Sequence, residues 1–599
     1  MKKILLETSF SKIYMIIMVI ITLLILGGYF SYAMFTVSKE KSNAISIVTG
    51  NLTYKLEVDG EESNKLVVDA NSSKEFIVTL SNPNNRIARF NFYYLNNLPN
   101  NVKAGYIIDC ETNSLPDAKG VNLEKEGSTG SSNIYKIMVE NNSNSDIEIK
   151  LGVNVGLDYN DLELPSNGHL FKEYINTPNA PELDDNMIAV TYNGSNWVKA
   201  DTNNKDNDWY NYDEQKWANA VTVSSSTRST YKNANVGTVI NMNDIETMWV
   251  WIPRYSYSIG SEDGTNYYGK QGEFLTTTPT QELPGEIDIK FVPTGEKDMC
   301  SAKYIVREND VINSWYTPDA FTFGDKELSG IWVGKFETSS SNPSASNGGG
   351  NTTELEPMIK PNITSWRYIN IANMYNVALK MNDAGNRYGF TSNIDSHMMK
   401  NSEWAAVSYL SQSKYGKLGN SNFSGANKEI YQNKSTSFIT GCSWGHPSGG
   451  TESDYGCQYT YDVDINGTGA STTGNIYGIY DMSGGSNEHV MGNYNNTIAE
   501  SGFNTMPESK YYDLYTPEDI DTLCNETNCL SHGLYETLNW YGDAFSVFSS
   551  NTYLSWVLRG GFYGYNRTDG ETGIFYFTIT PIYNGGPSNS QSYRIVISI

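Results

Sequence analysis

The chain has 599 residues, which is too long for one domain, so its length predicts about three folded units behind an N-terminal segment. Its formal net charge is −25, and its acidic residues are scattered with no basic run. Nucleic acid is therefore excluded as a partner, because phosphate binding needs clustered Lys and Arg. Aromatic residues at 13% and charged residues at only 18% are typical of β-rich extracellular proteins.

The first 35 residues predict export. Three lysines precede an apolar run from Ile13 to Leu26, which continues more weakly to Phe35. A positive flank followed by an apolar stretch is typical of an export signal. Ser31-Tyr32-Ala33 fits a cleavage site, whereas the run counted through Phe35 is about long enough to span a bilayer. Secretion and retention as a membrane anchor both stay open.

Residues 43–157 alternate between apolar and polar side chains with period two, for example from Leu52 to Val58. Turn clusters such as Asp59-Gly60 separate these stretches, so we expect an antiparallel β-sandwich. The export segment together with Ile45–Val58 also resembles the start of the secreted camelysin and TasA type of fibre or matrix proteins. We interpret the sandwich as a spacer or an assembly module.

Two shorter regions follow the predicted sandwich. Residues 158–183 are polar and carry three prolines, which indicates a linker. Residues 184–240 predict a small β-rich insert, with Asn193-Gly194 at a hairpin turn. A cluster of four aromatic residues in this region favours packing beneath a sheet over a sugar-stacking platform: Trp209, Tyr210, Tyr212 and Trp217.

The stretch Leu558–Ile599 has the composition of a binding loop between two fixed ends. It opens with Arg559-Gly560-Gly561 and closes with the strand-like Ser592–Ile597. The middle is almost all Tyr, Phe, Asn, Thr, Ser and Gly, which is the composition of a paratope. We therefore expect residues 558–599 to display side chains for a ligand.

These two ends resemble the formylglycine-generating-enzyme type of C-type lectin fold, in the sulfatase-modifying factor family. Asn475–His489 resembles the family pattern N-x-x-G-L-x-D-M-x-G-N-V-x-E-W, and Lys400–Ala405 resembles its P-T-E-A-E-W segment. Met248–Pro253 and Gly330–Glu337 resemble its entry strands. The resemblance covers roughly residues 241–599. The expected fold class is mainly β with α+β: an N-terminal antiparallel β-sandwich, then a C-type-lectin-like domain.

Two helices are predicted within this domain. Thr364 or Ser365 is suited to cap a helix that includes Ile371–Ala378, and Asn401 or Ser402 is suited to cap a second helix.

Disulfides are allowed in an exported chain. We expect Cys442–Cys457 and Cys524–Cys529, because each pair closes a short loop in an irregular region. Cys110 and Cys300 fall in different predicted domains. A zinc site with His446 or His532 is the rival interpretation, but the spacing matches no familiar finger.

No catalysis is expected. The resemblance implies that formylglycine generation needs two cysteines after the Arg-Gly-Gly, and this chain has none after Cys529. His489 beside Glu488 is typical of a hydrogen-bonded structural pair. An enzyme with another chemistry on the same scaffold stays an alternative.

The resemblance also implies calcium near one turn. Asp481, Asn487 and Glu488 offer the oxygen ligands that calcium prefers. However, Gly485 stands where the family has a ligating Asn, so a turn without metal is the alternative. No cofactor is required.

Chains that end in this way also resemble the variable proteins of diversity-generating retroelements, in which the last segment is mutated while the strands stay fixed. We therefore predict a cell-surface or secreted, receptor- or adhesin-like protein that binds a protein or glycan ligand at a cell or phage surface. A structural or fibre-forming subunit is the alternative. The expected exposed ligand-binding residues are Phe562, Tyr563, Tyr565, Asn566, Thr568, Phe575, Tyr576, Thr578, Thr580, Tyr583, Asn584, Ser588, Asn589 and Ser590.

Overall fold

A computed structural model describes residues 52–99, 101–107, 119–157, 162–174, 177–259, 284–294, 316–447, 455–516, 530–537, 539–543, 555–564, 572–579 and 584–599. The structure is mainly β, with 35% strand and 14% helix. It divides into two units, Met1–Ile175 and Asn176–Ile599, which are described in turn. The predicted export segment lies outside the described residues. Within those residues, no helix is both long and apolar enough to cross a membrane.

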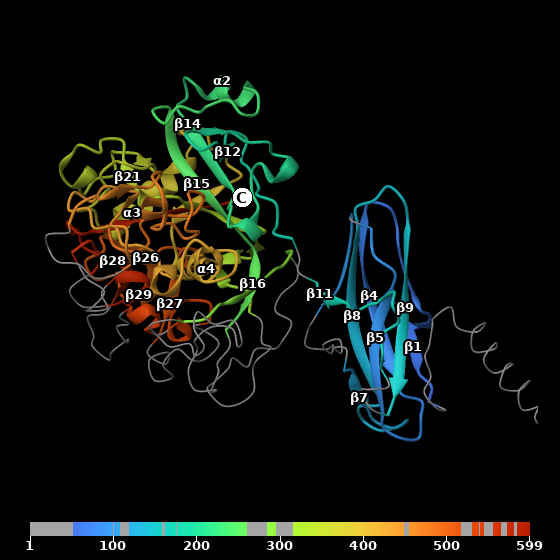
Figure 1. Cartoon of the computed structure of the whole chain (residues 1–599). Helices are drawn as coiled ribbons and strands as arrows, with labels where there is room; N and C mark the ends of the chain where they lie inside the picture. The colour runs from blue at the N-terminus through green and yellow to red at the C-terminus, as the bar shows by residue number, and fades with distance from the viewer. Residues whose placement is uncertain are drawn as a thin grey trace, which may run out of the picture. The chain divides into compact units, whose positions relative to one another are not determined.

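The N-terminal unit consists of two sheets around one core (blue to cyan in Figure 1). The first has the order β11-β6-β8-β4-β1-β2, with strands β1 (Lys55–Val58), β2 (Glu61–Glu62), β4 (Ser72–Ser81), β6 (Val102–Ile107), β8 (Ser132–Asn141) and β11 (Lys172–Glu173). The second has the order β10-β5-β9-β3, with β7 beside β5, and its strands are β3 (Lys65–Val68), β5 (Ala88–Leu95), β7 (Val121–Leu123), β9 (Ile147–Gly156) and β10 (Gly168–His169). Alternate side chains of both sheets are buried in the shared core, as the period-two pattern predicts.

The predicted linker 158–183 is wrong in its first half. Strand β10 pairs with β5 and β11 pairs with β6, so the N-terminal unit continues to about residue 175. Between them, Phe171 is only 6% exposed, and its ring lies 5.6 Å from that of Phe92 and 4.8 Å from that of Tyr94. Two short strands among polar residues and prolines give no periodicity signal.

The C-terminal unit contains a seven-stranded antiparallel sheet in the order β13-β12-β14-β15-β20-β31-β23. Its strands are β12 (Ile188–Tyr192), β13 (Trp197–Lys199), β14 (Asn219–Val223), β15 (Ile245–Pro253), β20 (Gly330–Gly334), β23 (Asp395–Met398) and β31 (Ile595–Ser598). The predicted insert 184–240 is therefore not separate, because β14 pairs directly with β15 and continues the sheet. Its aromatic residues pack in the core as expected: Trp209, Tyr212 and Trp217 are at most 2% exposed, and Tyr210 packs against them.

A second sheet lies in the same unit, in the order β27-β26-β28-β29 with β30 beside β26. Its strands are β26 (Asn487–Tyr494), β27 (Asp513–Tyr515), β28 (Trp556–Gly561), β29 (Thr572–Thr578) and β30 (Gln591–Tyr593). Four two-stranded ladders complete the strands: β16 (Tyr255–Ser258) with β17 (Asp288–Phe291), β18 (Thr322–Phe323) with β19 (Lys326–Glu327), β21 (Ser339–Ser340) with β22 (Pro357–Met358), and β24 (Cys442–Ser443) with β25 (Tyr459–Thr460).

The α-helices of the described residues are α2 (Arg228–Asn233), α3 (Ile371–Leu379), α4 (Asn401–Ser411) and α5 (Ile465–Thr468). The two longer ones exist as predicted, with α3 beside β23 and α4 beside β26, but their predicted caps are wrong. Asn370 caps α3 by accepting from the Asn373 N–H at 2.9 Å, because Thr364 and Ser365 instead form β-bridges. Asn401 and Ser402 lie inside α4, where the Glu403 carboxylate accepts from the preceding Lys400 N–H at 2.7 Å.

Candidate ligand-binding surface

The most prominent sequence motifs of the C-terminal unit meet in a buried ion pair. Arg594 lies where the chain passes from β30 to β31, and its Nε donates to Glu488 on β26 at 3.0 Å. Its other nitrogens donate to the Gly334 and Tyr480 carbonyls at 2.8 and 2.9 Å. Both charged side chains are fully buried. Burial raises the pKa of Glu488 to about 7, although Arg594 pulls it downward. The pair joins the two sheets.

A second buried arginine joins the other two motifs. Arg559 on β28 donates from Nε to the Asn401 side-chain oxygen on α4 at 2.8 Å, and from Nη2 to the His532 and Gly533 carbonyls at 2.7 and 3.0 Å. Burial lowers the pKa of Arg559 to about 10. The motif residues therefore fix the scaffold rather than face a ligand.

Two of the three predicted calcium ligands, Asp481 and Glu488, are engaged within the protein. Asp481 accepts from the Gly441 N–H at 2.9 Å, and from the Asn433 side-chain amide at 2.9 Å. Glu488 is held by Arg594, while the side-chain oxygen of Asn487 is buried without a protein partner. Among the described residues, no three His, Cys, Asp or Glu side chains gather where they could hold a metal ion.

His489 does not pair with its neighbour Glu488. Successive residues of strand β26 point to opposite sides, so the imidazole Nε2 lies 3.0 Å from Gln591 Oε1 on β30 instead. Burial lowers the pKa of His489 to about 4. The ring is a neutral core group at physiological pH.

Three of the predicted display residues are buried, so their prediction as exposed is wrong. Phe575, Tyr576 and Thr578 are 3%, 7% and 2% exposed on β29, which pairs with β28. The Phe575 ring packs 5.3 Å from that of Trp540 and 6.3 Å from that of Tyr541. Composition cannot separate this covered strand from the rest of residues 558–599, which is equally rich in aromatic and small polar residues. Five further predicted residues lie outside the described ones: Tyr565, Asn566, Thr568, Thr580 and Tyr583.

The remaining predicted residues lie at the two described ends of the segment, and aromatic contacts bring these ends together. The Tyr563 ring lies 4.8 Å from that of Phe562 and 4.9 Å from that of Phe438. Arg367 lies 3.7 Å above the Phe438 ring and donates from Nη1 to the Asn589 carbonyl. Burial lowers the pKa of Arg367. Asn589 is exposed, whereas Phe562, Tyr563, Asn584, Ser588 and Ser590 are half-buried.

Sequence reasoning missed four residues of this surface. Arg367 and Phe438 bridge its two ends, Tyr455 lies 5.8 Å from the Tyr563 ring, and the neighbouring Tyr368 is 49% exposed while its N–H donates to the Ser588 carbonyl at 2.7 Å. They come from segments far from residues 558–599, so no local pattern could have found them. We define the Tyr563 surface by these members: Arg367, Tyr368, Phe438, Tyr455, Phe562, Tyr563, Ser588, Asn589 and Ser590.

A disulfide anchors one part of the Tyr563 surface. Cys442 on β24 is bonded to Cys457, with a Cα–Cα distance of 5.2 Å, and this is one of the two pairings predicted from the sequence. The bridge lies two residues from Tyr455, whose hydroxyl donates to the Gly564 carbonyl at 3.1 Å. Cys524, Cys529, Cys110 and Cys300 lie outside the described residues.

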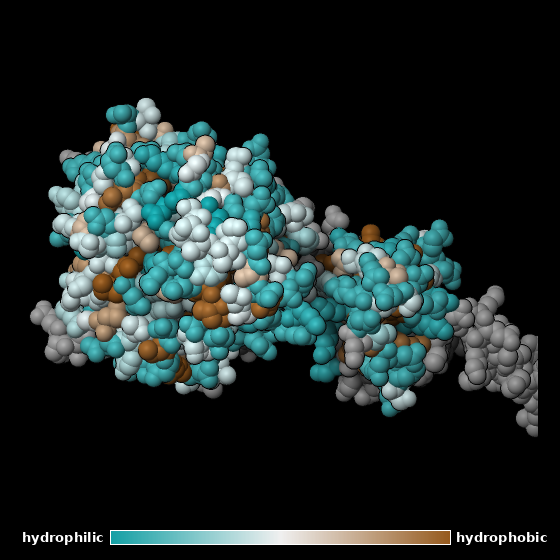
Figure 2. All heavy atoms as spheres, turned by 90° about the horizontal axis from the view of Figure 1, so that it is seen from above, coloured by the Kyte–Doolittle hydropathy of each residue, from teal (hydrophilic) through white to brown (hydrophobic). Residues whose placement is uncertain are grey.

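The face of the protein seen in Figure 2 is largely hydrophilic, with hydrophobic side chains scattered in small groups. Half-buried aromatic rings beside small polar residues are the chemistry by which binding loops combine rigid contact area with adaptable hydrogen bonds. Neither protein-family models nor the sequences of curated proteins give a match to the chain.

Proposed function

We propose that the protein is a surface-exposed, receptor- or adhesin-like binding protein whose C-type-lectin-like unit carries the ligand site. One observation carries this proposal: rings and an arginine bring Phe562 and Tyr563 together with Asn589 at a single surface. Under this proposal the N-terminal unit is a β-sandwich spacer and the first 35 residues direct export or anchor the chain. The ligand is a protein or a glycan on a cell or phage.

The scaffold beneath the Tyr563 surface supports a further part of the proposal, that the segment tolerates sequence change. Buried Arg594 and Arg559 tie the ends of residues 558–599 to β26 and α4. These contacts do not use the side chains of Ser588, Asn589 or Ser590. We propose that a retroelement diversifies such exposed positions while the buried contacts keep the fold.

Binding tests the central proposal. The purified protein is presented to a panel of intact bacterial cells and immobilised glycoproteins, and bound protein is quantified by flow cytometry and surface plasmon resonance. Replacement Tyr563→Ala is expected to weaken binding about 30-fold, because a buried aromatic anchor contributes about 2 kcal/mol. The control Leu514→Ala removes a side chain that is 40% exposed on β27. Equal binding by both variants would contradict the proposal.

Sequencing tests the diversification. The 3′ end of the gene is sequenced deeply across a growing population and related isolates, and adjacent DNA is searched for a near-copy. Substitutions are expected only in codons between Gly561 and Ser592, at adenines of that copy, and the codons of Phe575 and Thr578 should be spared. An invariant segment without a near-copy would remove this part of the proposal.

A structural subunit is the second candidate. Strand β3 is the last strand of its described sheet and leaves Val67 51% exposed, which is a feature that strand addition can use. Concentration-dependent polymerisation of residues 36–175, followed by light scattering, would favour this candidate over a binding role.

A further inference from the structure

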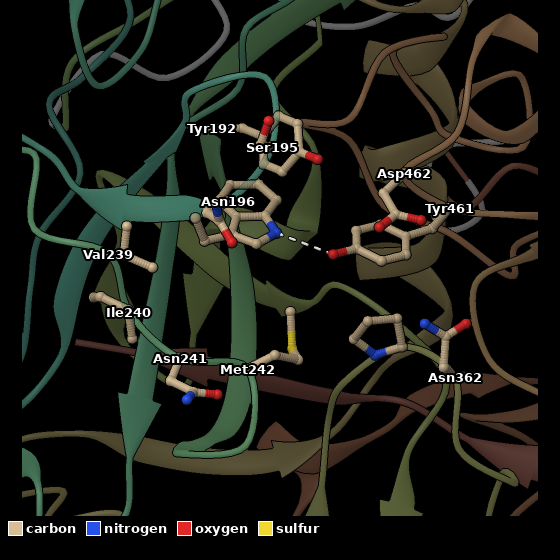
Figure 3. Close-up of a pocket in the computed structure, with 12 residues that line it drawn as sticks. Tyr192, Ser195, Asn196, Val239, Ile240, Asn241, Met242, Asn362, Tyr461 and Asp462 are labelled. Atoms are coloured by element: carbon tan, nitrogen blue, oxygen red, sulfur yellow. Dashed lines mark hydrogen bonds between the residues drawn. The ribbon is translucent and has the colours of Figure 1, made fainter.

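A pocket of about 390 Å³ opens in the C-terminal unit beside the β12–β13 hairpin. Trp197 and Tyr461 form its floor: they are 2% and 3% exposed, and the Trp197 indole donates to the Tyr461 hydroxyl at 3.3 Å. Figure 3 shows residues 239–242 on one side of the hollow and Asn362 and Asp462 on the other. The volume lies within the ~300–1,000 Å³ typical of small-molecule sites.

The walls of the pocket are held in place by the protein itself. The Tyr477 hydroxyl accepts from the Tyr192 N–H at 3.3 Å and donates to the Tyr192 carbonyl at 3.1 Å, which ties the hairpin to the domain. Opposite the hairpin, the Lys360 ammonium donates to the Met242 carbonyl at 2.9 Å, and the Asn362 N–H donates to the Thr440 carbonyl at 3.0 Å. A preformed pocket loses little conformational entropy when a ligand binds.

The rim of the pocket offers two neutral amides and one carboxylate as hydrogen-bonding groups. Asn196 and Asn362 are exposed, and among the described residues their side-chain amides hydrogen-bond to no protein group. Each amide supplies two donors and one acceptor, and the exposed carboxylate of Asp462 adds further acceptors. No Lys, Arg or His is among the lining residues.

This lining disfavours three classes of ligand. An anion would meet Asp462 with no compensating cation. A cation would meet a single carboxylate, that of Asp462, which already accepts from the Thr460 hydroxyl at 2.8 Å. It would also meet no open aromatic face, because Trp197 and Tyr461 are almost fully buried. A wholly apolar ligand would strip water from two amides without replacing their hydrogen bonds. Hydroxyl groups satisfy the rim best, since each one both donates and accepts.

We propose that this pocket binds a neutral saccharide unit, with Asn196, Asn362 and Asp462 bonded to its hydroxyls above the Trp197–Tyr461 floor. The pocket is built from residues other than those of the Tyr563 surface, so the inference does not rest on the function proposed above.

Saturation-transfer difference NMR on the full chain tests the proposal. The probes are glucose, galactose, mannose and N-acetylglucosamine as neutral sugars, with N-acetylneuraminate as the anion and choline as the cation. At least one neutral sugar is expected to bind, and the double variant Asn196→Ala, Asn362→Gly is expected to raise its Kd at least tenfold. Glycine suits position 362 because Asn362 has a φ of 61°.

The matched control is Asn427→Ala, which removes an exposed asparagine on the 3₁₀ helix Gly425–Lys428 and should leave the Kd unchanged. Three results would overturn the proposal: binding of no neutral sugar, preferential binding of choline or N-acetylneuraminate, or sugar binding that survives in the double variant. Loss of sugar binding in Tyr563→Ala, with no loss in the double variant, would move the sugar to the Tyr563 surface and overturn it equally.

Discussion

At the scale of single residues, the acidic and basic groups singled out in the sequence serve the core. Glu488 and Arg594 neutralise each other where the chain changes sheets. Neither side chain reaches solvent, so each one stabilises the fold only while the other is present. Breaking a buried pair leaves one charge without compensation, which costs far more than losing an exposed pair.

Glu488→Gln is therefore expected to lower the free energy of unfolding of the C-terminal unit by roughly 3–5 kcal/mol. The control is Glu356→Gln, which breaks an ion pair with Arg387 whose glutamate side chain is 53% exposed, and it should cost less than about 1 kcal/mol. Denaturant titration followed by tryptophan fluorescence measures both values. Equal losses of unfolding free energy in the two variants would show that the buried pair stabilises the fold no more than the exposed pair does.

The pKa values of two buried histidines are shifted in opposite directions. Burial alone would lower the pKa of His397, but Glu403 and Asp395 outweigh it and raise the pKa to about 9, whereas burial lowers the pKa of His489 to about 4. Because the folded pKa of His397 is raised, its contribution to stability is complete below about pH 6.5 and is lost as the pH rises through 9.

NMR titration of labelled histidine rings checks this prediction. The His397 signal should move near pH 9 and the His489 signal should stay constant down to about pH 4. In Glu403→Gln the His397 transition should shift to lower pH, because its principal carboxylate partner is gone. A His397 transition near 6.5 in the unaltered protein would contradict the assignment.

At the scale of elements, the segment 558–599 combines core strands with an exposed surface of the same composition. Strand β29 is rich in Phe, Tyr and Thr, the composition expected of a display segment, yet it pairs with β28 and is covered by Trp540 and Tyr541. Periodicity cannot identify a strand that is buried on both faces. Strands with one exposed face, such as β4, follow the alternating pattern and are predictable from it.

The variants Phe575→Ala and Phe562→Ala should distinguish residues that pack in the core from residues that bind the ligand. The first empties a core position and is expected to cost about 3–5 kcal/mol of stability. The second removes a half-buried ring of the Tyr563 surface and should cost about 1 kcal/mol or less while weakening ligand binding. Thermal unfolding and the cell-binding assay together measure both effects, and a similar loss of stability in the two variants would reject the distinction.

The disulfide is expected to stabilise the segment that carries Tyr455. The cysteines are 15 residues apart, and replacing both in Cys442→Ser, Cys457→Ser should cost roughly 3 kcal/mol by the chain-entropy account. Unfolding with and without reductant measures this, and the double variant serves as the control because any effect that reductant has on it comes from the other four cysteines. An identical response of the two proteins to reductant would contradict the prediction.

At the scale of the whole molecule, the length predicts about three folded units, whereas the structure divides into two. The alternating strands of the N-terminal unit are a local signal that can be recognised without knowing which strands pair, whereas export and the resemblance to the lectin fold stay predictions. The strands β10 and β11 and the merger of β12–β14 with the main sheet depend on pairing across many residues, as between β14 and β15. The Tyr563 surface could not be predicted from the sequence for the same reason, since only the fold brings Arg367 and Phe438 to it.

The corrected boundary has a measurable consequence for the N-terminal unit. Residues 52–175 should fold alone, whereas a version that ends at Leu157 lacks β10, β11 and the Phe171 ring that fills the core. Calorimetry should show a markedly lower Tm for the shorter version, because losing a buried Phe alone costs about 3–5 kcal/mol. Equal Tm values would restore the linker prediction.

The position of β31 makes completion of the main sheet of the C-terminal unit depend on translation of the whole chain in frame. This strand lies between β20 and the edge strand β23 of the seven-stranded sheet, although it is translated after every other strand of that sheet. The sheet cannot close until the ribosome has passed residue 598. Any frameshift or stop codon within residues 562–590 would remove the strand that joins β23 to β20. Only copies that have been read through in frame would fold, so a population that varies this segment would expose intact variants and discard broken ones.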